Sequence, residues 1–164
     1  MGSDAYPSSG NGYKSYGNGN CTWYAFYRAQ EILGECPTAL TPSALGSGDA
    51  FSWWNAHDKF AGYSTDYTKP KPGAIIVWGG TVPGHVAIVE EVGSDYIVLT
   101  ESSYGGVWYY NNAPKFNDPI VYNYYGKQNS SYWGSVKCKI SNIQNYAQYG
   151  EGDYIGFTGY IYLV

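Results

Sequence analysis

Residues 17–34 read GNGNCTWYAFYRAQEILG, a glycine- and asparagine-rich run followed by an amphipathic helix pattern. Apolar residues recur at helical spacing from Ala25 to Leu33, and Gly34 follows as the expected C-terminal stop. This pattern predicts a helix that begins near Cys21. At a helix start, unpaired amide groups and the positive end of the dipole favour a thiolate over a thiol. Because cysteine is also among the most often buried residues, a reactive Cys21 and a packed one remain equally open from this helix alone.

The rest of the chain changes from a helical to a strand-like pattern. A loop rich in Pro, Gly, Ser and Thr covers 37–48, and Asp49 can then cap a short second helix over 50–57. Apolar runs between turn residues predict strands over 74–78, 85–92 and 96–102, with further strands near 107–110, 120–125, 136–140 and 155–163. The turns between the first three strands are too short for parallel crossovers, so these strands pair antiparallel. Helices followed by a strand meander predict an α+β fold, with N-terminal helices packed on a mainly antiparallel β-sheet.

The composition limits the classes of function. A chain of 164 residues is expected to form one domain with its own core. The net charge of −4 and pI near 5.0 exclude a basic stripe for nucleic acid, and they give no attraction to an anionic wall or membrane. No apolar run reaches membrane-spanning length, and no signal peptide is recognisable. The 20 tyrosines would suit stacking on sugars, but half-buried strands use tyrosine as often.

Two histidines could serve as a base for a cysteine nucleophile. His57 ends the second predicted helix, whereas His85 opens a strand whose alternation places it with Ala87 and Val89 on one face. Antiparallel pairing across the following turn brings Glu101 opposite the start of that strand, near His85. A carboxylate there would fix the imidazole tautomer and leave the other ring nitrogen for the thiol. A structural histidine and an exposed strand carboxylate remain open as alternatives.

Cysteine and acidic residues give no pattern typical of a metal site. The chain has 3 cysteines, so at least one thiol is free, while Cys36 and Cys138 could form a disulfide or remain two buried thiols. Paired zinc-ligand spacing, the acidic pattern of a calcium loop and a phosphate-binding glycine motif are all missing from the sequence. We therefore predict neither a metal nor a cofactor.

Several motifs in register resemble the CHAP family, whose name stands for cysteine, histidine-dependent amidohydrolase/peptidase. They lie at residues 19–25, 48–50, 53–54, 72–75, 84–90 and 100–104. The resemblance covers about residues 17 to 104 in the order and spacing of the family. It implies a papain-like α+β fold and cleavage of peptidoglycan, as in phage lysins, tail-associated hydrolases and bacterial autolysins.

The resemblance also implies a role for each matching residue. Cys21 would be the nucleophile, His85 the general base and acid, and Glu101 the residue that orients the imidazole. Asn20 stands where the family usually has glutamine, one methylene longer, so we expect the backbone N–H of Cys21 to be the main oxyanion donor and Asn20 to support it. Aromatic residues within or beside these motifs are candidates for lining a substrate groove: Trp23, Trp54 and Tyr104.

The predicted organisation is a loosely held leader over 1–16 and a CHAP-like catalytic domain over 17–164. Residues 1–3 look like a cloning remnant, which favours a domain excised from a longer protein. We predict a monomer that acts on peptidoglycan at the bacterial cell wall, either outside the cell or delivered by a phage. Wall targeting would come from a separate wall-binding domain or subunit, or from a tail assembly.

The predicted reaction is hydrolysis of a peptidoglycan amide bond through a cysteine thioacyl intermediate, as in an N-acetylmuramoyl-L-alanine amidase or an endopeptidase. One alternative is a non-catalytic, tyrosine-rich module that binds walls or glycans. A second is a protein-directed cysteine peptidase that uses the same residues. The products released from purified walls would discriminate between the three.

Overall fold

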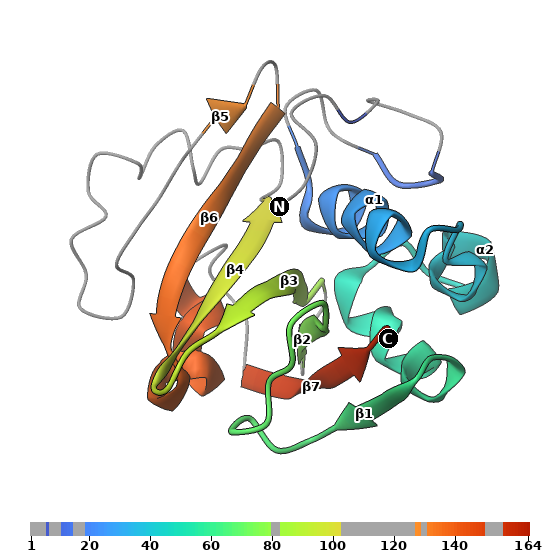
Figure 1. The fold of residues 1–164 in the computed structure, drawn as a ribbon. Helices are drawn as coiled ribbons and strands as arrows, with labels where there is room; N and C mark the ends of the chain where they lie inside the picture. The colour runs from blue at the N-terminus through green and yellow to red at the C-terminus, as the bar shows by residue number, and fades with distance from the viewer. Residues whose placement is uncertain are drawn as a thin grey trace.

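The computed structural model describes residue 6 and residues 11–14, 19–79, 83–102, 127–128, 131–149 and 156–164. Helices come first along the chain (Figure 1): α1 at Cys21–Leu33, the short 3-10 helix η1 at Thr38–Leu40, α2 at Pro42–Leu45 and the 3-10 helix η2 at Ala50–Lys59. The strands follow: β1 Gly62–Ser64, β2 Ile75–Gly79, β3 His85–Val92, β4 Tyr96–Ser102, β5 Lys127–Gln128, β6 Ser131–Lys139 and β7 Gly156–Tyr162. A further 3-10 helix, η5 at Ile140–Tyr149, lies between β6 and β7.

The strands form one sheet in the order β1-β7-β2-β3-β4-β6-β5. Every neighbouring pair is antiparallel. The predicted α+β fold, with helices followed by an antiparallel sheet, is therefore confirmed. β3 and β4 lie at the centre of this order, next to each other, so their residues are held by neighbours on both sides.

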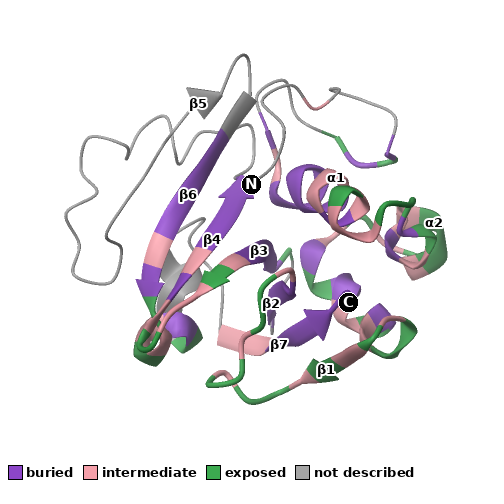
Figure 2. Cartoon of the chain, in the orientation of Figure 1, coloured by how far each residue is buried: buried purple, intermediate pink, exposed green. Residues whose placement is uncertain are grey.

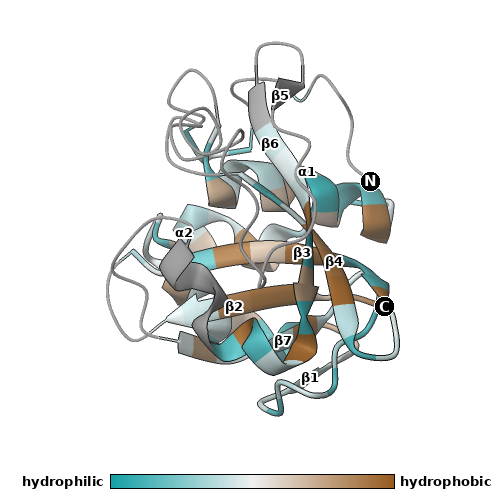
Figure 3. Cartoon of the chain, turned by 90° about the vertical axis from the view of Figure 1, so that its left-hand side faces the viewer, coloured by the Kyte–Doolittle hydropathy of each residue, from teal (hydrophilic) through white to brown (hydrophobic). Residues whose placement is uncertain are grey.

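The sheet is buried on both faces. Residues of α1, η1 and η2 pack on one face together with alternate residues of the central strands, among them Ile75, Val77, Val86 and Ile88. The opposite face packs against Ile143 of η5 and contains Ile76, Trp78, Ala87, Val89 and Leu99. Figure 2 shows the burial along β2, β3 and β4, and Figure 3 shows the apolar bands along the same strands. Burial on both faces explains why β2 has a continuous apolar run rather than an alternating one.

Local predictions near the site are mostly confirmed. α1 begins at Cys21, and Gly34 ends it in the left-handed conformation with φ 74°. The strands predicted over 85–92 and 96–102 coincide with β3 and β4. The loop predicted over 37–48 is wrong in part, because it contains η1 and α2. The strands predicted near 107–110 and 120–125 lie outside the described residues.

The second helix is present, but its predicted cap is wrong. Asp49 occupies the N-cap position of η2, yet its side chain makes no capping hydrogen bond. The Asp49 carboxylate instead accepts from Ser47 Oγ at 3.5 Å, and the Asp49 carbonyl accepts from Ser52 Oγ at 2.6 Å. The hydroxyl of Ser52 thus helps to hold the first turn through the backbone.

The leader predicted over 1–16 is described only at residue 6 and residues 11–14, and Asn11 and Tyr13 among these pack against the domain. Tyr13 is buried, donates its hydroxyl hydrogen to the Leu40 carbonyl, and accepts from Trp53 Nε1 at 2.9 Å. Asn11 is also buried and donates to the Trp23 carbonyl at 3.1 Å. Sequence composition predicted a loop but not the aromatic and amide contacts that dock it.

Candidate active site

Cys21 is the first residue of α1, and its backbone N–H is already hydrogen bonded. Asn20 is the N-cap residue, and its Oδ1 accepts a hydrogen bond from the Cys21 backbone N–H at 3.0 Å. Its Nδ2 donates to Thr22 Oγ1 at 3.2 Å. The Cys21 N–H, which we expect from the sequence to be the main oxyanion donor, is therefore hydrogen bonded to the Asn20 side chain in the free protein.

The structure brings together Cys21, His85 and Glu101. His85 Nε2 lies 2.7 Å from Glu101 Oε2, and the Cys21 side chain is close enough to the His85 imidazole to raise its pKa. The three residues are 5%, 2% and 1% exposed, respectively. Since Glu101 engages Nε2, Nδ1 is the ring nitrogen left to face the thiol. This is the arrangement in which one nitrogen is oriented by a carboxylate and the other exchanges a proton.

The electrostatics of the group favour a charged imidazole. Burial by itself lowers the pKa of His85, but the Glu101 carboxylate and the Cys21 side chain outweigh it and raise the pKa well above its ordinary value. A protonated imidazole next to a sulfur is the partner that a thiolate needs. The low dielectric of a buried site strengthens this interaction.

Neighbours on the sheet fix the orientation of the His85 ring. His85 pairs with Trp78 of β2 and stacks on its ring, with the centroids 5.5 Å apart and the planes 28° apart. Trp78 is itself held by a hydrogen bond of 2.8 Å from Nε1 to the Ile143 carbonyl. The predicted face of His85 is consistent with this contact, because Trp78 packs with Ala87 and Val89.

The other histidine belongs to an aromatic cluster on η2 and the edge strand β1. His57 stacks on Trp54 at 4.7 Å and meets Tyr63 edge-on at 4.4 Å. Its Nδ1 lies 2.6 Å from the Trp54 carbonyl oxygen. His57 is therefore packed among aromatic rings, whereas His85 pairs with Glu101 and has its pKa raised by the candidate nucleophile Cys21.

The predicted groove residues differ in their placement. Trp23 is fully buried in the core beneath α1, where it has no surface to offer a substrate; this corrects its assignment to a groove. Trp54 is half-buried beside Gly159, whose α-carbon leaves room for the indole. Tyr104 lies outside the described residues.

Trp133 lies near the candidate site and was not singled out by sequence reasoning. It pairs with Ser102, next to Glu101 on β4, and its ring stacks on Tyr24 of α1 with centroids 5.3 Å apart. Trp133 is buried, and among the described residues its Nε1–H finds no acceptor. A buried donor without an acceptor is uncommon in folded proteins. No motif signalled it, because β6 lies in the tyrosine- and asparagine-rich part of the chain.

Cys36 and Cys138 are both free thiols, so neither the predicted disulfide nor the predicted pair of buried thiols is observed. Cys36 is exposed, while burial followed by the Glu101 charge raises the pKa of Cys138 to about 12. Within the described ranges, no three His, Cys, Asp or Glu side chains gather in a way that could hold a metal ion. The same ranges contain no helix of the length and apolarity that crossing a membrane requires.

Comparison with models of known protein families matches this chain to the CHAP domain. The profile of the CHAP domain matches residues 8–103, which is more than half of the 164-residue chain. No solved structure matches the chain significantly. The matched segment includes Cys21, His85 and Glu101, so the family and the geometry agree on the same part of the fold.

Three curated relatives are similar over part of their length. N-acetylmuramoyl-L-alanine amidase sle1 of Staphylococcus epidermidis is 34% identical over 57% of this chain and 26% of its own length. "Probable autolysin LDP" of Staphylococcus aureus is 36% identical over 66% of this chain and 36% of its own length. Staphylococcal secretory antigen ssaA2 of S. aureus is 38% identical over 63% of this chain and 33% of its own length. The match thus spans about a quarter to a third of these longer relatives.

Proposed function

The chain belongs to the CHAP domain family, and from this premise we propose that it hydrolyses an amide bond of bacterial peptidoglycan through a thioacyl intermediate on Cys21. The observation that carries the proposal is the 2.7 Å contact of the buried His85 Nε2 with the Glu101 carboxylate, in a site where the Cys21 side chain raises the pKa of the same imidazole. The same geometry disfavours a module that only binds walls, because sugar binding needs no buried thiol, imidazole and carboxylate in contact.

Acylation follows from the two nitrogens of His85. In the resting site the thiol proton lies on Nδ1 of the charged imidazole, so the Cys21 thiolate attacks the amide carbonyl carbon while Glu101 holds the imidazolium through Nε2. When the tetrahedral intermediate collapses, the C–N bond breaks and His85 returns the proton to the leaving amine. A water molecule, deprotonated by the same nitrogen, then attacks the thioester and releases the carboxylic acid and the free thiol.

The developing oxyanion needs hydrogen-bond donors. We propose that the Cys21 N–H becomes one of them once the substrate oxygen displaces Asn20 Oδ1, which accepts from it at 3.0 Å in the free enzyme. We assign a second donor to the buried Trp133 Nε1–H, which has no acceptor among the described residues.

The names of the relatives guide our proposal for which amide bond is cleaved and where the enzyme acts. The sle1 relative is named an N-acetylmuramoyl-L-alanine amidase. The bond between the lactyl group and the first alanine is therefore our first choice, ahead of a peptide bond within the stem or cross-bridge. An autolysin name among the relatives favours action at a bacterial wall over delivery by a phage. With a net charge of −4, this chain gains no attraction to an anionic wall, so we place targeting in a separate wall-binding domain or subunit.

The test is digestion of purified staphylococcal peptidoglycan followed by mass spectrometry of the released fragments. Wild type is expected to release new amino and carboxyl ends, and the fragment masses identify the bond. Cys21→Ala is expected to release none, and His85→Ala to lose on the order of 10³-fold or more in rate, because such residues act as a unit. If the protein digests casein but leaves purified walls intact, it is instead a protein-directed peptidase.

His57→Ala is the matched control. It removes the other histidine of the chain from its stack on Trp54, so we expect a lower melting temperature and a retained rate. A folded His57→Ala protein with no activity would show that the wrong histidine was assigned as the base. Wall hydrolysis by pure Cys21→Ala would refute the mechanism as a whole.

A further inference from the structure

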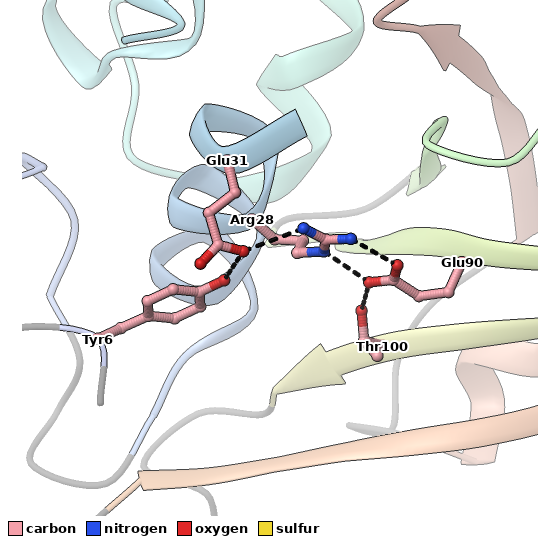
Figure 4. A network of polar contacts seen from close by, with 5 residues as sticks. All are labelled: Tyr6, Arg28, Glu31, Glu90 and Thr100. Atoms are coloured by element: carbon pink, nitrogen blue, oxygen red, sulfur yellow. Dashed lines mark hydrogen bonds and ion pairs between the residues drawn. The ribbon is translucent and has the colours of Figure 1, made fainter. Parts of the chain in front are cut away.

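The helix that carries Cys21 is tied to the sheet by an ion pair with little exposure. Arg28 donates from Nε to Glu90 Oε1 and from Nη2 to Glu90 Oε2, both at 2.9 Å (Figure 4). The side chains are 17% and 10% exposed. Two parallel hydrogen bonds from a planar guanidinium fix direction as well as distance, which a single contact does not.

Glu90 occupies an irregular position of β3. Val89 pairs with Leu99, and pairing resumes with Glu91 opposite Val98, so Glu90 is the extra residue of a β-bulge. Such bulges re-aim a side chain and are frequent next to active sites. Here the bulged residue meets Arg28 on α1.

The same carboxylate also reaches the next strand. Thr100 of β4 donates from Oγ1 to Glu90 Oε1 at 2.6 Å, and Thr100 is fully buried. Burial by itself raises the pKa of Glu90, but the hydrogen bonds from Arg28 and Thr100 outweigh it and lower the pKa. Glu90 is therefore charged at neutral pH and connects α1, β3 and β4.

These three elements are the ones that carry the candidate catalytic residues. Arg28 lies about two turns after Cys21 on the same face of α1, because seven residues are close to two full turns. His85 begins the strand that contains Glu90, and Glu101 directly follows Thr100. The contact therefore sets the helix against both strands without touching a reacting atom.

We propose that Arg28, Glu90 and Thr100, here named the helix clamp, are positioning residues that hold the Cys21 thiol against the His85 imidazole. The inference rests on the proposed function, since it gives the clamp a part in the chemistry of Cys21. A displacement of about 1 Å at a nucleophile can lower a rate by roughly 10²-fold, so a clamp of this precision has a measurable effect.

A second partner of Arg28, Glu31, supplies a matched control. Arg28 Nη1 also pairs with Glu31 Oε2 at 3.0 Å, and the Tyr6 hydroxyl donates to the same oxygen at 2.7 Å. The Glu31 side chain is 35% exposed, and exposed pairs contribute little. Glu31→Gln therefore changes the charge next to Arg28 but leaves the clamp intact (Figure 4).

The experiment compares the full chain with Arg28→Lys, Glu90→Gln, Thr100→Val and Glu31→Gln. Lysine keeps the charge but loses the bidentate fork, and valine keeps the shape of threonine but loses the hydrogen bond. Turnover is measured on soluble fragments of staphylococcal peptidoglycan. Alkylation of Cys21 by iodoacetamide is followed against pH by peptide-level mass spectrometry, which separates Cys21 from the exposed Cys36.

We expect Arg28→Lys and Glu90→Gln to lower kcat roughly tenfold to a hundredfold with an unchanged apparent KM. Their alkylation profile should shift to higher pH, because a displaced imidazole no longer supports the thiolate. Thr100→Val should show a smaller change in the same direction, and Glu31→Gln should match wild type. Wild-type kcat and alkylation profile in both Arg28→Lys and Glu90→Gln would overturn the proposal.

Ile76→Val, which trims the core on the opposite face of the sheet, is the control for a clamp that only stabilises the fold. This variant is expected to lower the melting temperature while kcat and the alkylation profile stay at wild-type values. An equal loss of kcat in Ile76→Val and Arg28→Lys at equal melting temperature would overturn the clamp. Failure of the proposed function is recognised separately, because Cys21→Ala would then act on walls like wild type while the alkylation profiles still report on the clamp.

Discussion

Gly84→Ala tests how tightly the turn before the candidate base is packed. Gly84 directly precedes His85 and has φ +73°, a conformation that residues with a side chain rarely adopt. A Cβ at this position would lie 2.7 Å from the Trp78 carbonyl oxygen, 2.8 Å from Phe51 Cβ and 3.0 Å from Phe51 N. These atoms belong to backbone or to a Cβ, so none can swing aside. The Phe51 N–H also donates to the Pro83 carbonyl at 3.0 Å, which ties η2 to this turn.

The expected loss of stability has two parts. The left-handed conformation costs a residue with a Cβ about 1–2 kcal/mol. Overpacking against fixed neighbours adds about 1–3 kcal/mol, because β2 and η2 have to move apart. For a domain of this size each kcal/mol lowers the melting temperature by about 2–4 °C, so we expect a decrease of roughly 5–15 °C.

Gly34→Ala separates the two parts. Gly34 has nearly the same φ, +74°, but a Cβ there would meet no atom within 4 Å. This variant should lose only the conformational part, about 1–2 kcal/mol, and keep wild-type turnover. Gly46, with φ +70° and the same open surroundings, offers a second control.

The assay is thermal unfolding followed by circular dichroism, together with turnover on purified peptidoglycan at a temperature where each variant is folded. Because the strain falls on the residue next to His85, Gly84→Ala should also lose turnover, whereas the two control variants should not. Equal melting temperatures for Gly84→Ala and Gly34→Ala would refute the packing of η2 on this turn.

Two further predictions concern the site itself. Burial lowers the pKa of His85, but Glu101 and Cys21 raise it well above its ordinary value in the folded protein. The charged His85 therefore stabilises the folded state fully below about pH 6.5, and this contribution is lost as the pH rises through the folded pKa. The stability difference between wild type and Glu101→Gln, on the order of 3 kcal/mol at low pH, should therefore shrink in alkaline buffer; a difference that grows with pH would contradict the pairing. Trp133→Phe keeps a ring on Tyr24 but removes the indole N–H. It should lower turnover roughly 10²-fold, the usual effect of losing one oxyanion donor, and wild-type turnover would exclude Trp133 from that role.

The elements that hold the nucleophile and base could be predicted because their signals are local. The helix from Cys21 to Leu33 has both its apolar period and its glycine stop in the sequence. The turn between β3 and β4 is short, so antiparallel pairing across it predicted Glu101 near His85, and the resemblance to the CHAP family then favoured an orienting role over an exposed strand carboxylate. Such features depend on residues close in sequence, and they were recognised without knowledge of the fold.

The features that sequence reasoning missed depend on residues far apart in the chain. The bulge at Glu90 is visible only as a shift in pairing with β4, and its partner Arg28 lies on a helix far upstream. Trp133 enters the site because β6 pairs with β4, a register that composition cannot supply. Trp23 occurs in a motif that also includes the nucleophile, yet the helix turns its ring into the core.

Asn20, which stands where the family usually has glutamine, caps the helix that carries Cys21. Its side chain is short enough for Oδ1 to fold back onto the N–H of Cys21, the next residue, at 3.0 Å, while Nδ2 holds Thr22 Oγ1. This cap stabilises the start of α1, as asparagine does at helix N-termini in general. The same contact occupies a donor that an oxyanion would use, so a substrate has to exchange its oxygen for Oδ1. The exchange is favourable only when the incoming oxygen carries more negative charge than an amide, which is true of the tetrahedral intermediate and not of the substrate carbonyl. If the Cys21 N–H is the oxyanion donor that we propose, this cap favours binding of the transition state over binding of the substrate.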